Sequence, residues 1–422
     1  HIVQHGLGIV FVTGSLIGIG LILTRHIIGR LVDDPLVGKY LIVFSPFIVL
    51  FPLRAVAFNT LRAEERSISA VLSRDFIGRV LPFTVLGCAI LLGMPVLGAV
   101  TYWLGVQLAI MLSAFFFLRD RYPITDLVTI LPESSTIQRL GRFSLPLAVG
   151  TYFFTFLSYF DLLMIGFFLD PDQVGFYRAI QPLQQASVLL MTAFTFLFLP
   201  IATQFYEEGD IGGLDTFYTV STKWLMAGTL PIVLVFGLFS EDVVRTLFGV
   251  DYLPAAPALA ILVSGQYFRA IVGLDGDIVK AIDRTEIELG SAMVGVLVDL
   301  VLNIYLIPRY GIAGAAIGTV AGYTVYNVVE VIAIHHILGI HPFSFNNFKP
   351  LMMTTVLALG IHHLTADIEL GIVGLGILGA LFGLITLASL ILTRSLDVTD
   401  MELLNRVEER TGFNLGSFTR LF

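Results

Sequence analysis

The chain has 422 residues, of which 56% are hydrophobic and only 13% are charged, and its mean hydropathy is +0.89. A soluble domain carries about 25% charged residues, so this composition excludes an ordinary soluble enzyme. The single cysteine excludes a disulfide framework and a cysteine-rich metal module. The net charge of −8 provides no basic surface, so we expect no nucleic-acid partner.

The apolar runs are long enough to cross a membrane. A helix needs about 20 apolar residues to do so, and backbone hydrogen bonding in lipid allows only helices or closed barrels. The runs lack the alternation of barrel strands, so we expect an all-α polytopic membrane protein with about twelve visible transmembrane helices. They are expected at residues 7–24, 36–58, 80–97, 98–118, 143–168, 175–202, 217–240, 255–274, 286–307, 312–334, 348–366 and 371–393. Near Met94 and Pro95 the boundary is open to another division.

The distribution of basic residues predicts the orientation of these helices. Most of the 24 Lys and Arg residues fall in one set of alternate loops and helix ends. Loops rich in Lys and Arg face the cytoplasm. We therefore expect a multi-pass protein of the cytoplasmic membrane with both termini of this chain in the cytoplasm.

The spacing of the apolar runs also predicts how the chain is divided. Residues 1–118 are expected to form an N-terminal helical lobe, and residues 119–142 a cytoplasmic connector. A C-terminal six-helix lobe follows at 143–334, then an additional transmembrane helix pair at 348–393. The last segment, 394–422, reads as a cytoplasmic amphipathic tail, because Thr399 and Glu402 have the spacing of a helix capping box.

Polar residues on one face of a span predict a substrate cavity. Arg178, Gln181 and Gln185 lie at positions i, i+3 and i+7, so they form one stripe, and Gln266 precedes Arg269 by three residues. An arginine can hold an anionic group, and amides can hydrogen-bond to sugar hydroxyls. The alternative is that these side chains only join helix to helix inside the bundle.

Acidic residues within spans are candidates for binding a coupling ion or a proton, since a charge in the membrane is retained only with a partner or a cavity. Asp161 lies in mid-span, and Asp299 shares a helix face with Asn303 four residues later. Asn303 joins the candidate cavity residues. The alternative for both acids is a buried pairing with an arginine.

Enzyme signatures are missing from the sequence. There is no Gly-x-x-x-x-Gly-Lys-Ser/Thr phosphate-binding loop and no Gly-x-Ser-x-Gly nucleophile motif. We therefore expect no enzymatic activity, no catalytic residue, no metal site and no cofactor, with a coupling Na⁺ or H⁺ left open.

Several segments from about residue 140 onward resemble one family of membrane exporters. The longest is LNIYLIPRYGIAGAAIGT at 302–319, in which Pro and Gly make a tight turn and small residues allow close helix packing. The others are 142–147, Asp161 with 165–167, 174–179, Pro200 and 247–252. Together they resemble the flippases for lipid-linked oligosaccharides, which form the polysaccharide-biosynthesis branch of the multidrug/oligosaccharidyl-lipid/polysaccharide (MOP) superfamily. The resemblance covers the first 118 residues only loosely.

The resemblance implies two MATE-like helical lobes around a central cavity. It also implies translocation of a polyprenyl- or dolichyl-(pyro)phosphate-linked oligosaccharide by alternating access. The partners would be membrane lipid, this glycan carrier and glycosyltransferases of the same pathway. Since family members have two six-helix lobes, and only about four spans precede residue 143, we expect one N-terminal helix pair to be missing and about fourteen helices in the full chain.

Three other functions remain open at this point. A cation-coupled multidrug antiporter of the same superfamily would depend on Asp161 and Asp299. A membrane-embedded glycosyl- or acyltransferase would need acids or histidine–aspartate pairs at the interface. A scaffold subunit would transport nothing.

Overall fold

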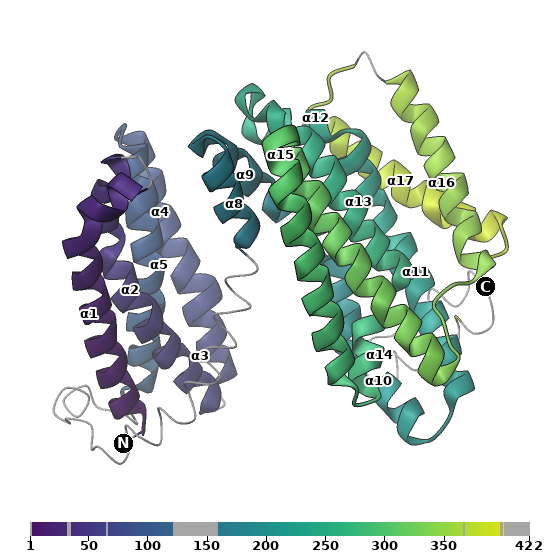
Figure 1. Ribbon diagram of the computed structural model, residues 1–422, viewed down its shortest axis with the longest axis horizontal. Helices are drawn as coiled ribbons and strands as arrows, with labels where there is room; N and C mark the ends of the chain where they lie inside the picture. The colour runs from purple at the N-terminus through teal and green to yellow at the C-terminus, as the bar shows by residue number, and fades with distance from the viewer. Residues whose placement is uncertain are drawn as a thin grey trace. The chain divides into compact units, whose positions relative to one another are not determined.

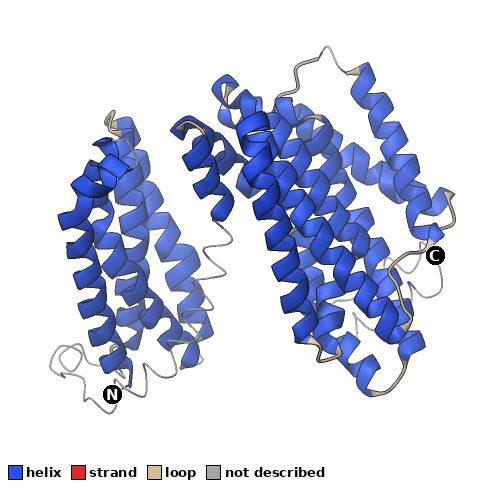
Figure 2. Ribbon diagram, in the orientation of Figure 1, coloured by secondary structure: helices blue, strands red, loops and turns tan. Residues whose placement is uncertain are grey.

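The computed structural model describes residues 2–31, 35–64, 66–120, 159–365, 368–396 and 400, and these residues form helices joined by short turns, with no strand among them (Figures 1 and 2). The chain divides into two compact units, His1–Tyr152 and Phe153–Phe422. Most of the expected connector, 121–142, lies outside the described residues, as does the amphipathic tail beyond residue 400. The all-α membrane fold predicted from the sequence is confirmed.

The first unit is a bundle of long apolar helices. They are α1 (Ile2–Leu31), α2 (Pro35–Ala63), α3 (Ser67–Val71), the π-helical turn Leu72–Ile77, α4 (Gly78–Leu91) and α5 (Pro95–Leu118). Its small core contains Ala57, Leu61 and Leu118, each at most 1% exposed. Many large apolar side chains, such as Leu23, point outward. A helix that is apolar all round without being buried in protein suits a lipid environment.

The boundary between α4 and α5 differs from the expected one. The expected break at residue 97 is wrong, because α4 ends at Leu91 and α5 begins at Pro95. Gly93 adopts a left-handed conformation with φ +74°, which glycine tolerates best. Pro95 occupies the first turn of α5, where its missing N–H is harmless.

The second unit contains the remaining helices. They are α8 (Phe160–Phe168), α9 (Pro171–Ser187), α10 (Leu189–Glu207), α11 (Ile211–Leu238), α12 (Ser240–Phe248), α13 (Ala256–Val272), α14 (Asp275–Ala281), α15 (Thr285–Leu338), α16 (Phe345–Leu364) and α17 (Ile372–Leu392). Its buried core is formed by side chains from every helix from α8 to α17. The described residues include eight helices with the length and composition to cross a membrane. The exact number of spans therefore stays a prediction.

The expected span 175–202 is interrupted. Val188, with φ −105° and ψ +5°, separates α9 from α10. Pro182 lies inside α9 and removes one backbone donor. The Ser187 hydroxyl donates to the Gln184 carbonyl oxygen (2.6 Å) in the last turn before the break. The polar stripe of α9 thus ends at a discontinuity in the helix.

The element α15 is two helices that meet at Gly311, which has φ +59° and ψ −141°. The expected turn at 308–311 lies at this point. The two halves run antiparallel and touch closely, since an added Cβ atom on Gly322 would lie 2.8 Å from the Gly295 carbonyl oxygen. A Cβ atom on Gly318 would lie 2.2 Å from Asn303 Oδ1. Small residues therefore let the first half of α15 present Asp299 and Asn303 against the second half.

Candidate functional site

Five of the predicted cavity residues line one cavity in the second unit. Its volume is about 500 Å³. Arg178, Gln181 and Gln185 come from α9, while Gln266 and Arg269 come from α13. The helical spacing read from the sequence thus places both groups on faces that meet across this cavity. Tyr159, Asp161, Tyr177, Gln184, Val188, Thr319 and Tyr323 complete the lining.

Each cavity arginine is bonded to a glutamine of its own helix. Arg178 Nη1 donates to Gln181 Oε1, and Arg269 Nη1 donates to Gln266 Oε1 at 3.1 Å. Gln266 is buried, while Arg178 is exposed to the cavity. Among the described residues, Arg269 Nε has no acceptor. These arginines retain donor capacity for an anion because one neutral amide satisfies only part of a guanidinium.

An aromatic ring lies beneath each of the two guanidinium groups. The Arg178 Cζ atom is 5.8 Å from the ring centroid of Tyr159, and the Arg269 Cζ atom is 5.2 Å from that of Tyr323. Cation–π contact of this kind orients a guanidinium without neutralising its charge. Both positive charges therefore remain directed at the cavity.

Asp161, Asp299 and Asn303 form a cluster whose members come from α8 and the first half of α15. Asn303 Nδ2 donates to Asp161 Oδ1 (2.9 Å) and to Asp299 Oδ1 (3.0 Å). Thr319, from the second half of α15, donates its hydroxyl to Asp161 Oδ2 (2.7 Å). Asn303 Oδ1 is buried and has no partner among the described residues. One amide thus joins two acids whose proximity could not be predicted from the sequence.

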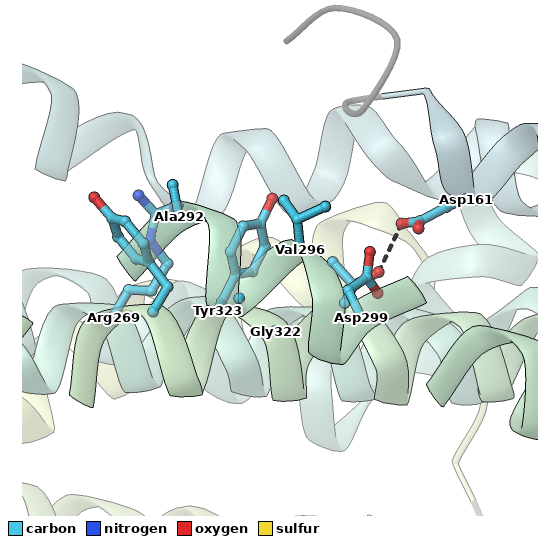
Figure 3. Close-up of a pocket in the computed structure, with 10 residues that line it drawn as sticks. Asp161, Arg269, Ala292, Val296, Asp299, Gly322 and Tyr323 are labelled. Atoms are coloured by element: carbon cyan, nitrogen blue, oxygen red, sulfur yellow. Dashed lines mark hydrogen bonds between the residues drawn. The ribbon is translucent and has the colours of Figure 1, made fainter. Parts of the chain in front are cut away.

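The two carboxyl groups lie close together at one end of the cavity in Figure 3, and Asn303 donates to both of them. Two carboxylates that share one amide donor repel each other, so a cation or a proton at this place is favourable. Among the described residues, no ion pair joins either acid to an arginine.

A second cavity, of about 350 Å³, adjoins the first (Figure 3). Asp161, Arg269, Thr319 and Tyr323 line both cavities. Figure 3 shows Arg269 at one end of the labelled row and the acids at the other, with Tyr323 between them. The site therefore has a cationic end and an acidic end on the same helical scaffold.

Two residues of the site were missed by sequence reasoning. Thr319 and Tyr323 lie one helical turn apart on the second half of α15. The available signal was the glycine spacing at Gly314, Gly318 and Gly322, which marks the face where the two halves of α15 touch. Polar residues next to that face, such as Thr319 and Tyr323, lie where the two halves of α15 meet the cavity.

A family model described as "Polysaccharide biosynthesis protein" matches residues 9–206. The match therefore includes the first unit, whose resemblance to the family is loose in its sequence motifs.

Among curated proteins, the chain is similar to an uncharacterized membrane protein of Methanocaldococcus jannaschii, with 25% identity over 55% of this chain and 46% of that protein. Two relatives are from Haloferax volcanii. The probable low-salt glycan biosynthesis flippase Agl15 is 23% identical over 45% of this chain and 40% of its own length. The probable flippase AglR is 27% identical over 42% and 38%. The chain spans less than half the length of these relatives.

Solved structures show the same fold. The chain is similar to the lipid II flippase MurJ in an inward closed conformation, with a TM-score of 0.67, 17% identity and coverage of 91% of this chain and 83% of that one. An inward-facing MATE family multidrug transporter of the MOP superfamily gives a TM-score of 0.59 at 17% identity, covering 80% of each chain. The chain thus has the fold of MATE-like exporters, and its residues 9–206 match the family model of polysaccharide-biosynthesis proteins.

Proposed function

We propose that this protein is a flippase that carries a polyprenyl- or dolichyl-(pyro)phosphate-linked oligosaccharide across the cytoplasmic membrane for cell-surface polysaccharide or glycoprotein synthesis. Transport proceeds by alternating access without ATP hydrolysis. The observation that carries the proposal is the cavity in which Arg178 and Arg269 face the same space with their glutamines. The names of the two Haloferax volcanii relatives support the same class of activity.

The chemistry of this cavity suits a phosphate joined to a sugar. Guanidinium groups bind phosphate through several parallel N–H donors. Gln184 and Gln185 add amides, and Tyr323 adds an aromatic face. Cavities of about 350 and 500 Å³ have the size of sites for small ligands. The protein would thus hold the phosphate and the nearest sugars, while the lipid tail stays in the bilayer, where its burial in protein is unnecessary.

We further propose that the acidic end binds the coupling cation, Na⁺ or H⁺, as transported cargo. The carboxyl oxygens of Asp161 and Asp299 and the hydroxyl of Thr319 are hard oxygen ligands, which suit small cations. The partnerless Asn303 Oδ1 adds a further oxygen at the same place. A proton would instead bind to one of the two carboxyl groups.

The same acidic end favours one second candidate, the cation-coupled multidrug antiporter. In that case a cationic drug would compete with the coupling ion at Asp161 and Asp299, and the arginines would be dispensable. The membrane-embedded transferase and the scaffold subunit have no comparable observation in their favour.

Flipping in liposomes tests the proposal. A short-chain polyprenyl-pyrophosphate carrying a fluorescent oligosaccharide is the probe, and its movement between leaflets is measured by quenching from outside. We expect Arg178→Ala and Arg269→Ala each to lower the rate at least about tenfold, since a charged hydrogen bond contributes roughly 1.5–3 kcal/mol. Arg309→Ala is the matched control, because Arg309 is exposed and lines neither cavity. Equal rates in all three variants would refute a role for the cavity arginines.

A further inference from the structure

Two buried acids of the second unit lie outside both cavities. Asp275 begins the short helix α14, which Figure 1 shows at the lower end of this unit, and Glu330 lies in the second half of α15. Their exposed fractions are 4% and 0%. Neither lines a cavity of the transport site. Burying a carboxylate without a compensating partner is strongly unfavourable, so these two groups need an explanation of their own.

Gly276 brings the two acids together. A Cβ atom on Gly276 would lie 3.4 Å from Glu330 Oε2 and 3.3 Å from the Tyr326 hydroxyl oxygen, so both groups close over the backbone next to Asp275. Glu330 Oε1 accepts a hydrogen bond from Ser291 (2.9 Å). Within the described part of the chain, Asp275 Oδ2 and Glu330 Oε2 have no hydrogen-bond partner. The Asp275 oxygen is thus buried and unsatisfied, and the nearest donor to the Glu330 oxygen is the Tyr326 hydroxyl.

The surrounding charges do not neutralise this pair. Lys280 Nζ contacts Glu288 at 3.0 Å and Asp277 at 4.0 Å, so its charge is directed to other carboxylates. The Tyr218 hydroxyl donates its proton to the Val272 carbonyl oxygen (2.7 Å). The titratable and charged groups that face the pair are Tyr218 from α11, Arg269 from α13, Lys280 from α14, and Glu288 and Tyr326 from α15.

Burial raises the pKa of the Asp275 carboxyl well above its ordinary value, and the nearby Glu330 raises it further. The backbone N–H of Gly276 and the guanidinium of Arg269 act in the opposite direction and are the smaller effects. Asp275 therefore prefers its neutral form, which agrees with its unsatisfied oxygen.

We propose that Asp275 and Glu330 form a proton-binding site of the second unit, separate from the Asp161–Asp299 cluster, in which one of the two buried carboxyl groups holds a proton. The bound proton removes one of two like charges. A metal ion fits less well, because the described residues contain no group of three or more acidic, histidine or cysteine side chains able to hold one. A proton is therefore the cation that this site binds.

Arg269 connects this site to the substrate cavity, since it lines that cavity and also acts on the Asp275 carboxyl. Proton uptake by the pair removes negative charge near Arg269 and so strengthens the cavity's attraction for an anion. This consequence rests on the proposed flippase function, whereas proton binding itself does not.

Infrared difference spectroscopy of the purified full chain in detergent tests the proposal, because a protonated carboxyl and a carboxylate absorb at different frequencies. Spectra are compared between about pH 5 and about pH 9, where ordinary acids are ionised. We expect wild type minus Glu330→Gln, and wild type minus Asp275→Asn, to contain a protonated-carboxyl band at neutral pH. Wild type minus Glu288→Gln, the control for an ion-paired acid, should contain only carboxylate bands.

A second variant and added Na⁺ test the same protonated-carboxyl band. If variants of the pair do not fold, the double variant Asp161→Asn/Asp299→Asn leaves the site intact, and its neutral-pH band should persist. Loss of that band would overturn the proposal, as would its removal by added Na⁺, which would indicate a metal-cation site. Flipping is measured separately, so failure of the flippase proposal leaves the spectroscopic result unaffected.

Discussion

Replacing Gly318 by alanine is a sharp perturbation of the acidic end, because the change is one methyl group on the helix behind it. The added Cβ atom would lie 2.2 Å from Asn303 Oδ1, 2.9 Å from Asn303 Cγ and 3.1 Å from Asp299 Oδ1. Favourable contacts between heavy atoms lie at about 3.5–4.0 Å. Asn303 must therefore move by roughly 1 Å, which separates it from Asp161 and Asp299.

The expected magnitude follows from the two bonds that Asn303 donates. A hydrogen bond to a charged group contributes about 1.5–3 kcal/mol, and alanine returns at most about 1 kcal/mol of helix propensity over glycine. We expect a net loss of about 2–5 kcal/mol in the free energy of unfolding. The affinity for the coupling cation should fall roughly 100-fold, which corresponds to about 2.8 kcal/mol.

The assay is thermal unfolding of the purified protein with and without Na⁺ and at several pH values. The matched control is Gly290→Ala on the same helix, where an added Cβ atom meets nothing within 4 Å. We expect the control to keep the wild-type response to the cation. Adding Asn303→Ala to Gly318→Ala should recover stability, because the smaller side chain no longer clashes with the new methyl group. The response to the cation should stay lost, because the amide that joins the two acids is missing. If Gly318→Ala behaves like Gly290→Ala, the assignment of Asn303 as the joining amide is refuted.

Three other predictions follow from described contacts. Lys223→Met should lower the free energy of unfolding by about 3–5 kcal/mol, because Lys223 Nζ contacts Asp400 Oδ2 at 2.5 Å and both side chains are buried. Adding Asp400→Leu should recover most of this loss, and chemical denaturation measures the stability of both variants. The pKa of Asp275 is higher in the folded state than its ordinary value of 3.8, so the folded protein binds more protons and its stability falls as the pH rises above about 4. Asp275→Asn should therefore raise the melting temperature at neutral pH but not at acid pH. Thr319→Val, which removes the hydroxyl donor to Asp161 while keeping the shape, should abolish the cation response while leaving phosphate-analogue binding intact.

Helical periodicity predicted the parts of the site that lie on one helix. The stripe of Arg178, Gln181 and Gln185 and the pair of Gln266 and Arg269 needed only residue spacing, and the structure brings both to one cavity. Spacing succeeds here because every residue of a regular helix has a fixed direction around the axis.

The joining of Asp161 to Asn303 could not be predicted from the sequence. The two residues are 142 positions apart, and their contact depends on how α8 packs against α15. The interruption at Val188 was also missed, since no glycine marks it and Pro182 lies six residues earlier. The buried pair of Lys223 and Asp400 depends on chain connectivity that no helical pattern reveals. Tertiary packing decides each of these contacts.

The central claim is that the arginine end of the cavity serves an anionic, lipid-linked glycan. The most direct test measures two activities of Arg178→Ala/Arg269→Ala in the same liposomes: flipping of the polyprenyl-pyrophosphate-linked fluorescent oligosaccharide and cation-driven export of a cationic dye. The account predicts that wild type flips the glycan carrier, that the double variant does not, and that neither exports the dye. Dye export by both proteins, with no glycan flipping by wild type, would contradict it.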